Sequence, residues 1–401
     1  MEAGNSVLGD VRVLDFTRVL SGPYCTAMLS DLGAEVIKIE APGGVDPSRS
    51  FSPPDVAGES TYFMQLNRNK QSVVLDLGTP HGRAAAAALA STVDVVVENF
   101  RPGVTHRLGL DYDAVKAANP DVVYCSITGY GSTGPLAGRA GLDPVIQAES
   151  GLMAMTGEPD GAPMRIGISL VDVTSGMYAA HAILAALMHR NRTGEGQQVA
   201  VSLFDTGVNM LTNFGASYLM TGVEPGRPGN GNLVAQPSGL YQSADGPLVM
   251  SCVGDSAFRR LCIEGLEQPQ LVEDERFATN PARLAHVDAL SAILNALFAE
   301  DRREVWIEKL RGAGIPCGEV RSVAQAMQSP EFAQAGLVDE VEHPRAGKVP
   351  LLRSPVRMDR TPVKTPAAAP ALGQHTEQVL ATLDLTDAQR QAVLGDGQPR
   401  D

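Results

Sequence analysis

The chain has 401 residues, 44 % of them hydrophobic, and carries a formal net charge of −14 at pH 7. This composition supports a large buried core and excludes a disordered chain, and the acidic balance disfavours general nucleic-acid binding. Five scattered cysteines without a Cys-x-x-Cys pair are typical of a reducing compartment. The N-terminus shows no signal-peptide pattern, and the dispersed histidines lack the spacing of metal ligands. We therefore expect a cytoplasmic protein with no metal, no membrane segment and no nucleic-acid partner.

The first half of the chain alternates short apolar runs, typical of strands, with segments of helical pattern. Gly33 ends the first predicted helix, and Thr79 and Pro80 open another, with threonine at the cap and proline in the first turn. Short apolar strands that alternate with helices predict a parallel sheet covered on both faces. The predicted strands are residues 11–16, 35–40, 72–77, 94–100, 121–129 and 197–204.

A nearly apolar helical pattern follows a lone acid, Asp172, and ends before Gly194 with basic residues in its last turn. Its longest apolar run, residues 177–188, is about half of a membrane span. Asp172 has two interpretations at this stage. As a helix cap, it would accept a backbone N–H and stabilise the helix by about 0.5–2 kcal/mol. As a nucleophile, it would be a charged, poorly hydrated carboxylate in apolar surroundings.

Composition divides the chain into a large α/β domain, a Gly/Pro/Asn-rich linker, a smaller α+β domain and a C-terminal segment that returns to the first domain. These parts are predicted at residues 1–220, 221–232, 233–325 and 326–401, respectively. The smaller domain is expected to begin with a hairpin whose turn contains Asp245 and Gly246. The C-terminal segment ends with a capping-box pattern formed by Thr386 and Gln389, which predicts a final helix.

The stretch "GYGSTG" (129–134) matches the G-x-G-x-x-G pattern and follows a predicted strand. A dinucleotide-binding fold requires a helix immediately after this pattern, but Pro135 and another glycine-containing loop follow here. The pattern therefore predicts a flexible glycine turn and disfavours a nicotinamide site.

Several basic residues fall in loops near the predicted strands, which is where α/β proteins bind ligands. A single arginine or lysine in such a loop is most often a solvated surface residue, whereas six around one sheet favour a phosphate-bearing ligand. The six residues are Arg18, Lys38, Lys70, Arg101, Arg107 and Arg139.

Collinear stretches along nearly the whole chain carry a family resemblance. They are "VLDFTRVLSGPYCTAMLSDLGAEVIKIEAPGGVDPSR", "LNRNKQSVVLDLGTPHGR", "DVVVENFRPGVTHRLGLDYD", "ITGYGSTGP", "TGEGQQVAVSLFD", "DERFATNPARLAHVDAL", "GIPCGEV" and "LGQHTEQVL". Together they resemble the class III CoA-transferases, the family of formyl-CoA transferase, carnitine CoA-transferase and α-methylacyl-CoA racemase. The resemblance implies a large Rossmann-like parallel-sheet domain with a smaller α+β domain, in an interlocked homodimer.

The resemblance also implies the chemistry. The family's catalytic carboxylate lies in a D-x-x-x-G element before a helix, here "VDVTSG", so Asp172 is implied as the nucleophile. It would form an aspartyl anhydride with the donor acyl group and then an aspartyl-CoA thioester. CoA and acyl-CoA are thus implied as substrates, with a carboxylic acid as acceptor and with no metal, nicotinamide or flavin. For the acids, we expect a short dicarboxylic acid with succinyl-CoA as donor.

The family's CoA-binding positions map onto loops after the first strands. Relatives carry arginine where this chain has Ala41 and Pro42, so Lys38 or Lys70 is expected to replace those phosphate contacts. A glycine-rich lid of the family corresponds to "GNGN" (229–232), for which an ordinary interdomain link is an equal alternative. The implied CoA-binding set is Arg18, Val19, Ser21, Lys38, Ala41, Lys70, Leu75, Asn99, Phe100, Arg107 and Asp143.

Racemase relatives have a histidine in "AGHD", whereas this chain reads "AGLD" with Leu142 at that place. Leucine cannot transfer a proton, so a two-base racemase mechanism loses one partner. Asp143 beside it could orient a substrate or CoA, or could be structural. The alternatives to a transferase are a racemase that uses other bases, an intramolecular CoA shuttle, and a CoA-binding protein without catalysis.

Overall fold

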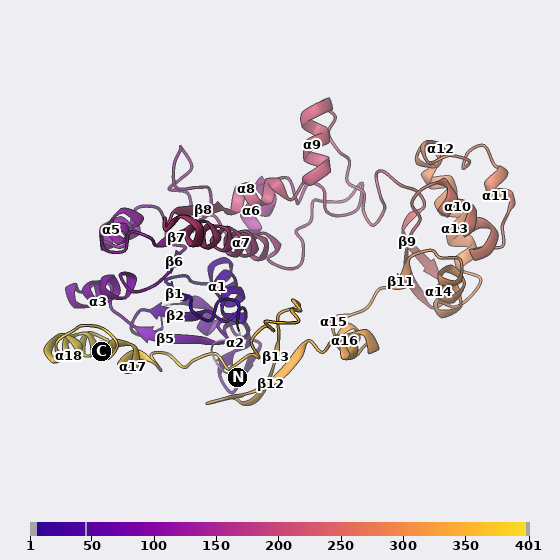
Figure 1. Ribbon diagram of the computed structural model, residues 1–401. Helices are drawn as coiled ribbons and strands as arrows, with labels where there is room; N and C mark the ends of the chain where they lie inside the picture. The colour runs from indigo at the N-terminus through magenta and orange to yellow at the C-terminus, as the bar shows by residue number, and fades with distance from the viewer. Residues whose placement is uncertain (1–5, 45, 398–401) are drawn as a thin grey trace. The chain divides into compact units, whose positions relative to one another are not determined.

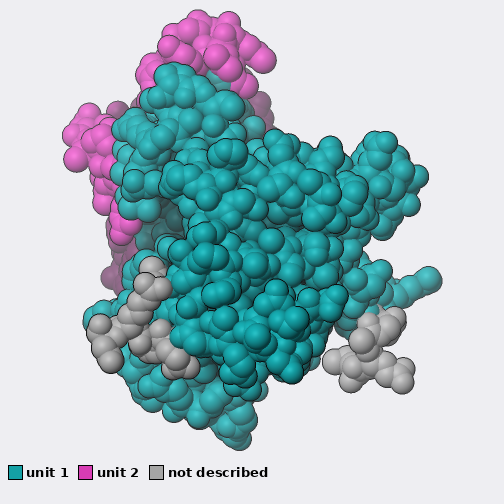
Figure 2. Space-filling view, turned by 90° about the vertical axis from the view of Figure 1, so that its left-hand side faces the viewer, with its two compact units in different colours: residues 1–151, 166–215, 336–401 teal, residues 152–165, 216–335 magenta. Residues whose placement is uncertain are grey.

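The computed structural model describes residues 6–44 and 46–397 and divides into two compact units, which Figure 2 colours separately. Unit 1 consists of Met1–Gly151, Ile166–Gly215 and Gly336–Asp401, and unit 2 consists of Leu152–Arg165 and Ala216–Ala335. The chain therefore leaves unit 1 twice and ends in it. Residues 152–165 lie within the predicted large domain by sequence but cluster with unit 2.

Unit 1 is built on a six-stranded parallel sheet with the order β5-β2-β1-β6-β7-β8. This is the strand order of the doubly wound Rossmann sheet, in which the order reverses between the first and fourth strands, here β1 and β6. The predicted strand at residues 35–40 is confirmed as β2. The strands are β1 (Arg12–Asp15), β2 (Glu35–Glu40), β5 (Lys70–Val74), β6 (Val95–Glu98), β7 (Val123–Thr128) and β8 (Gln198–Ser202).

Strands β2 and β6 are buried along nearly their whole length, because helices cover both faces of this sheet. On one face, Leu14, Ile37 and Val73 share a hydrophobic core with four helices. These are α3 (Pro80–Ala90), α5 (Tyr112–Ala118), α17 (Thr376–Leu380) and α18 (Asp387–Asp396). On the other face lie α1 (Ser21–Asp31) and α7 (Leu170–Thr193), which pack against each other (Figure 1).

The predicted helix boundaries follow local chemistry. Thr79 accepts a hydrogen bond from the Gly82 N–H at the start of α3, which has proline in its first turn. Gly194 ends α7 with a φ of 76°, a conformation that glycine adopts without steric cost. The predicted capping box at the start of α18 is also confirmed.

Helix α7 is long and apolar enough to cross a membrane by length and composition alone. Its other contacts are those of a core helix, because it packs against α1, α8 (Leu203–Asn209), β7 and β8. A core helix of a globular domain can have the same length and composition, and these contacts place α7 in unit 1 beside α1.

The C-terminal segment packs on unit 1 at two places. The hairpin β12 (Val338–His343) and β13 (Gly347–Leu352) shares a small core with α2 (Thr61–Leu66). Beyond it, His375 and Thr376 bind the outer edge of β5: the Ser72 carbonyl accepts the His375 N–H at 2.9 Å, and the Thr376 hydroxyl accepts the Val74 N–H at 3.0 Å. The shorter elements of unit 1 are η2 (Pro47–Ser50), β3 (Asp55–Val56), β4 (Glu59–Ser60), α4 (Val104–Leu108) and α6 (Asp143–Glu149).

Unit 2 contains an antiparallel sheet with the order β11-β10-β9, packed against helices around Phe298 and Trp306. The predicted hairpin is confirmed, since β9 (Ser238–Ser243) and β10 (Gly246–Ser251) pair across a turn at Asp245. The remaining elements are β11 (Cys317–Glu319), α10 (Asp255–Arg260), η3 (Leu261–Gly265), α11 (Gln270–Glu273), α12 (Asn280–Ala285), α13 (Val287–Phe298), α14 (Arg303–Gly312), α15 (Val323–Met327) and α16 (Pro330–Ala335). Helix α9 (Thr212–Thr221) spans the boundary between the two units.

Candidate active site

Asp172 lies inside the first turn of α7, which begins at Leu170. The cap position is Ser169, whose side chain makes no capping hydrogen bond. The capping interpretation of Asp172 is therefore wrong. The carboxylate that binds the free N–H groups of this turn comes from another helix: Asp143 Oδ2 accepts the Val171 N–H at 2.8 Å and the Asp172 N–H at 3.2 Å.

Asp143 is itself firmly held at the start of α6. Its side chain is buried, and Gln147 Nε2 donates to Asp143 Oδ1 at 2.6 Å from one turn along the helix. Gln147 Oε1 also accepts the Ile166 N–H at 2.9 Å, which fixes the segment that leads into α7. The sequence left open whether Asp143 orients a substrate or CoA or is structural, and these contacts support the structural role, because they hold the Asp172 turn in place.

The surroundings of Asp172 oppose its ionisation. Burial, followed by the like charge of Asp143, raises the pKa of Asp172 to about 7, although a hydrogen bond with the Ser21 side chain lowers it. A raised pKa at a partly buried carboxylate is one mark of a functional site, which makes Asp172 a candidate for the reacting group.

Gly176 explains the spacing of the D-x-x-x-G element. A residue four positions after Asp172 lies one turn away on the same face of α7. A Cβ at Gly176 would lie 2.5 Å from the Ser21 carbonyl oxygen and 3.3 Å from the Cys25 N, so only glycine allows α1 to approach this closely. The close approach brings Ser21, the first residue of α1, to Asp172.

Three of the implied CoA positions meet where the order of the parallel sheet reverses. Arg18 follows β1, and Asn99 and Phe100 follow β6. Asn99 Oδ1 accepts the Arg18 N–H and Asn99 Nδ2 donates to the Arg18 carbonyl, both at 2.9 Å. The Arg18 guanidinium lies 5.4 Å from the centre of the Phe100 ring. Ligands of open α/β sheets bind in this crevice at the carboxyl ends of the strands.

Lys38 and Lys70 are not at the surface. The Lys38 ammonium is fully buried, 2.9 Å from Asp46 Oδ2, and donates to the Thr17 carbonyl at 2.7 Å. The Lys70 ammonium is also fully buried, 3.1 Å from Asp15 Oδ2, and burial lowers the pKa of Lys70 to about 8. Both ammonium groups are already paired with buried carboxylates, so neither is available to bind a phosphate.

The other implied positions differ in exposure. Leu75 has no exposed side chain and belongs to the core, so only its backbone could meet a ligand. Ala41 is half-buried directly after β2, and Arg107 is exposed on α4. Arg139 is paired with Glu149 and stacks on Tyr130, which gives it a structural role in the loop after β7.

The sequence analysis missed an apolar pocket beside this site. The pocket has a volume of about 560 Å³. Among its lining residues, Leu20 adjoins Ser21, and Tyr62 packs edge-on against Phe51 with ring centres 5.3 Å apart. Burial raises the pKa of Tyr62, and the charge of Asp172 raises it further, which places this ring near the carboxylate. The residues around Tyr62 form no motif with a chemical meaning of its own, so only the fold could bring them to Asp172.

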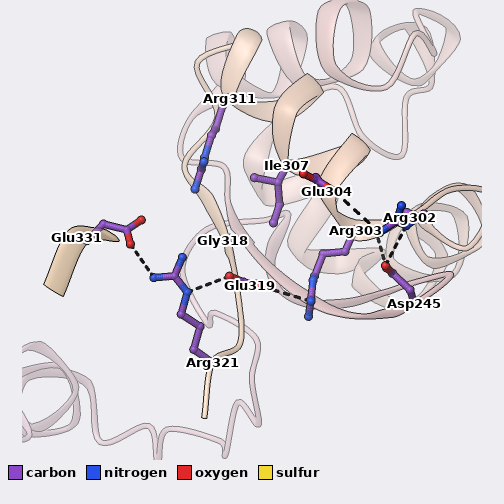
Figure 3. Close-up of a pocket in the computed structure, with 10 residues that line it drawn as sticks. All are labelled: Asp245, Arg302, Arg303, Glu304, Ile307, Arg311, Gly318, Glu319, Arg321 and Glu331. Atoms are coloured by element: carbon purple, nitrogen blue, oxygen red, sulfur yellow. Dashed lines mark hydrogen bonds and ion pairs between the residues drawn. The ribbon is translucent and has the colours of Figure 1, made fainter. Parts of the chain in front are cut away.

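Two features belong to unit 2. A cavity of about 500 Å³ is lined by both basic and acidic side chains (Figure 3). Its Arg302, Arg303 and Arg321 are paired with Asp245, Glu319 and Glu331. Because the charges neutralise one another, this cavity has no marked preference for an anion. The "GNGN" segment at 229–232 follows Arg227, whose guanidinium donates to the carbonyls of Ala154, Glu158 and Gly161. Within residues 6–44 and 46–397, no three His, Cys, Asp or Glu side chains group as metal ligands.

Comparison with known proteins agrees with this geometry. The family described as CoA-transferase family III matches residues 8–376. Succinate–glutarate CoA-transferase of Agrobacterium fabrum is 39 % identical and covers 94 % of this chain and 96 % of its own length. Succinyl-CoA:glutarate CoA-transferase of Mus musculus is 40 % identical over 93 % of this chain and 85 % of its own length. The crystal structure of a CAIB/BAIF family protein from Brucella suis superposes with a TM-score of 0.84 at 39 % identity, covering 95 % of this chain and all of that one. The chain therefore belongs to CoA-transferase family III and is a CoA-transferase.

Proposed function

We propose that this enzyme moves CoA from an acyl-CoA to a carboxylic acid through covalent intermediates on Asp172. The observation that carries this proposal is a half-buried aspartate, Asp172, whose pKa is raised to about 7 and which lies next to the start of α1, near the point where the strand order of the sheet reverses. The carboxylate attacks the thioester carbonyl carbon, the C–S bond breaks, and CoA leaves as the thiolate. The product of this step is a mixed anhydride between Asp172 and the donor acyl group.

The anhydride then exchanges its partners. The CoA thiolate attacks the Asp172 carbonyl carbon, and the donor acid leaves as its carboxylate, which gives an Asp172–CoA thioester. The acceptor carboxylate attacks this thioester, and the two steps run in reverse to release the new acyl-CoA and free Asp172. Each attack builds negative charge on a carbonyl oxygen, which N–H groups at the start of α1 are suited to stabilise.

CoA is proposed to bind at the carboxyl ends of β1 and β6. The turn after β1 supplies Arg18 and Val19, with Ser21 at the start of α1, and the segment after β6 supplies Asn99 and Phe100. The exposed Arg107 on α4 is available for a phosphate, and the backbone around Ala41 and Leu75 lines the neighbouring loops.

We also propose the homodimer that the family resemblance implies. Its support is apolar surface that unit 1 and α9 leave uncovered. Met177 and Met188 on α7 are 48 % and 69 % exposed, and Leu219 and Met220 on α9 are 85 % and 84 % exposed. Apolar side chains exposed in this number along two helices mark an interaction surface.

For the acids, we propose a short dicarboxylic acceptor with succinyl-CoA as donor. The support is the naming of the two curated relatives described above, both glutarate CoA-transferases. The apolar pocket around Tyr62 and Leu20 is wide enough for the carbon chain of such an acid.

A donor–acceptor matrix tests the function. The protein is incubated with one acyl-CoA and an isotopically labelled second acid, and new CoA esters are followed by mass spectrometry, with Asp172→Ala as the blank. Label in a new CoA ester that requires Asp172, together with borohydride trapping at that residue, supports the proposal. Full-speed exchange by Asp172→Ala would overturn it. Loss of α-deuterium from an acyl-CoA without any acceptor would instead identify a racemase, and label-free migration within one diacid an intramolecular shuttle.

A further inference from the structure

The turn that joins β1 to α1 contains a residue in an unfavourable conformation. Val19 has a φ of 68°, in the left-handed region that a β-branched side chain rarely adopts. Glycine would take this conformation freely, so a valine there persists only because the surrounding structure enforces it. The turn therefore needs identifiable holding contacts.

Side chains from three other segments supply these contacts. Asn99, after β6, binds both the N–H and the carbonyl of Arg18 at 2.9 Å. Asp46, after β2, accepts the Val19 N–H through Oδ1 at 3.3 Å. Lys38, on β2, donates to the Thr17 carbonyl at 2.7 Å. The backbone of the turn is thus held at consecutive peptide groups by side chains rather than by secondary structure.

The Lys38–Asp46 ion pair holds the backbone of the Val19 turn in place. Both side chains are almost completely buried, and their charged atoms lie 2.9 Å apart. Asp46 Oδ1 also accepts the Ser48 N–H at 3.0 Å and the Ser48 hydroxyl at 2.7 Å. A buried ion pair with this many hydrogen bonds has one well-defined geometry, and removal of one partner leaves an uncompensated charge.

The turn leads directly to the proposed nucleophile. Ser21, two residues after Val19, packs its carbonyl against Gly176, one helical turn from Asp172, and its side chain reaches Asp172. We infer that Lys38, Asp46 and Asn99 are positioning residues for catalysis, which act through the Val19 turn on the contact between Ser21 and Asp172. This inference rests on the proposed function, and it gives Lys38, a buried member of the implied CoA set, a role other than phosphate binding.

A double-mutant cycle on the full-length protein tests this inference. Ser21→Ala removes the contact with Asp172 and is expected to lower kcat about tenfold, the usual effect of losing one hydrogen bond to a charged group. Asp46→Asn is expected to lower kcat by a similar factor. If Asp46 acts through Ser21, the double variant loses no more than roughly twofold beyond the worse single variant. Independent effects would multiply to about a hundredfold, and that result, or an unchanged kcat in Ser21→Ala, would overturn the inference.

Asn99→Ala provides a second cycle with Ser21→Ala, since it loosens the same turn without leaving a buried charge. The matched control is Asp31→Asn at the opposite end of α1, where Asp31 pairs with Arg68 and both side chains are at most 5 % exposed. This control is expected to keep kcat per active site within about twofold of the unmodified enzyme, because the interaction lies far from the turn. Active sites are counted by trapping the enzyme-bound CoA thioester, so lost folding does not lower the value. If Asp31→Asn lost as much kcat as Asp46→Asn, the loss in Asp46→Asn would reflect general destabilisation of the protein, and the inference would be overturned.

The two proposals can fail separately. If the Asp172→Ala variant still exchanges CoA, the proposed function is overturned, regardless of the results of the double-mutant cycles. Exchange that requires Asp172, together with multiplicative losses in both cycles, removes only the positioning role of Lys38, Asp46 and Asn99.

Discussion

Asp143 binds the backbone N–H of Asp172 through the same carboxylate whose charge opposes ionisation of the Asp172 side chain. The two effects act on different parts of one residue. The hydrogen bonds fix where the Asp172 turn lies, whereas the like charge adds to the effect of burial, which raises the pKa of the Asp172 side chain. A carboxylate that is fixed in place and poorly hydrated when ionised fits the proposed role of a nucleophile.

The rate of the first half-reaction should depend on pH around neutrality. Because burial and Asp143 raise the pKa of Asp172 to about 7, the nucleophilic carboxylate is depleted below that pH. We expect kcat/KM for the acyl-CoA to fall about tenfold for each pH unit below about 6.5 and to level off above about 7.5. Initial rates between pH 5 and pH 9 measure the profile. A flat profile down to pH 5 would show that the reacting group is an ordinary carboxylate.

Removal of the charge on Asp143 should move this profile. In Asp143→Asn the like charge is lost, so the pKa of Asp172 falls and the midpoint of the profile shifts to lower pH. We also expect kcat to fall, since the amide binds the Val171 and Asp172 N–H groups less strongly than a carboxylate. Glu149→Gln at the other end of α6 is the control. It should leave the midpoint in place.

Asp172 should reduce the stability of the fold at neutral pH. The folded protein keeps the Asp172 proton up to about pH 7, whereas the unfolded chain releases it near pH 4, so stability falls as the pH rises between these values. Asp172→Asn removes this penalty. We expect it to raise the free energy of unfolding by roughly 2–4 kcal/mol at pH 8 and by less than about 0.5 kcal/mol at pH 4. Urea unfolding at both pH values measures the difference, and Asp121→Asn at an exposed site should show none.

The glycine that faces α1 should be intolerant of any side chain. The Cβ of Gly176→Ala would meet the Ser21 carbonyl oxygen at 2.5 Å, so the two helices must separate. We expect a loss of at least about 2 kcal/mol in the free energy of unfolding and of most exchange activity. Gly312→Ala at the end of α14 is the matched control, because no atom lies within 4 Å of its new Cβ. That substitution should be neutral or stabilising by up to about 1 kcal/mol.

The sequence predicted those features that depend on neighbouring residues. The cap at Thr79, the stop at Gly194 and the strand at residues 35–40 each follow from local pattern, and all three are confirmed. The resemblance added Asp172 and the family, which pattern alone left open. The signal for the three local features lies within a few consecutive residues, whereas the resemblance rests on collinear stretches along nearly the whole chain.

The features that were missed depend on distant partners. Asp143, whose carboxylate binds the N–H groups of the α7 turn, lies 28 residues before Val171, with an irregular stretch of chain between them. The sequence analysis interpreted Lys38 as a ligand contact, because lysine is rarely buried. Its partner Asp46 lies beyond the end of β2, and only the fold brings the two side chains together. Contacts of this kind carry no periodic signal in the sequence.

His375 and Thr376 cover the outer edge of β5, an edge strand of the parallel sheet. Without this cover, N–H and carbonyl groups of β5 would be open to pairing with a strand of another chain. The segment that follows the β12–β13 hairpin thus closes a sheet edge that would otherwise favour aggregation.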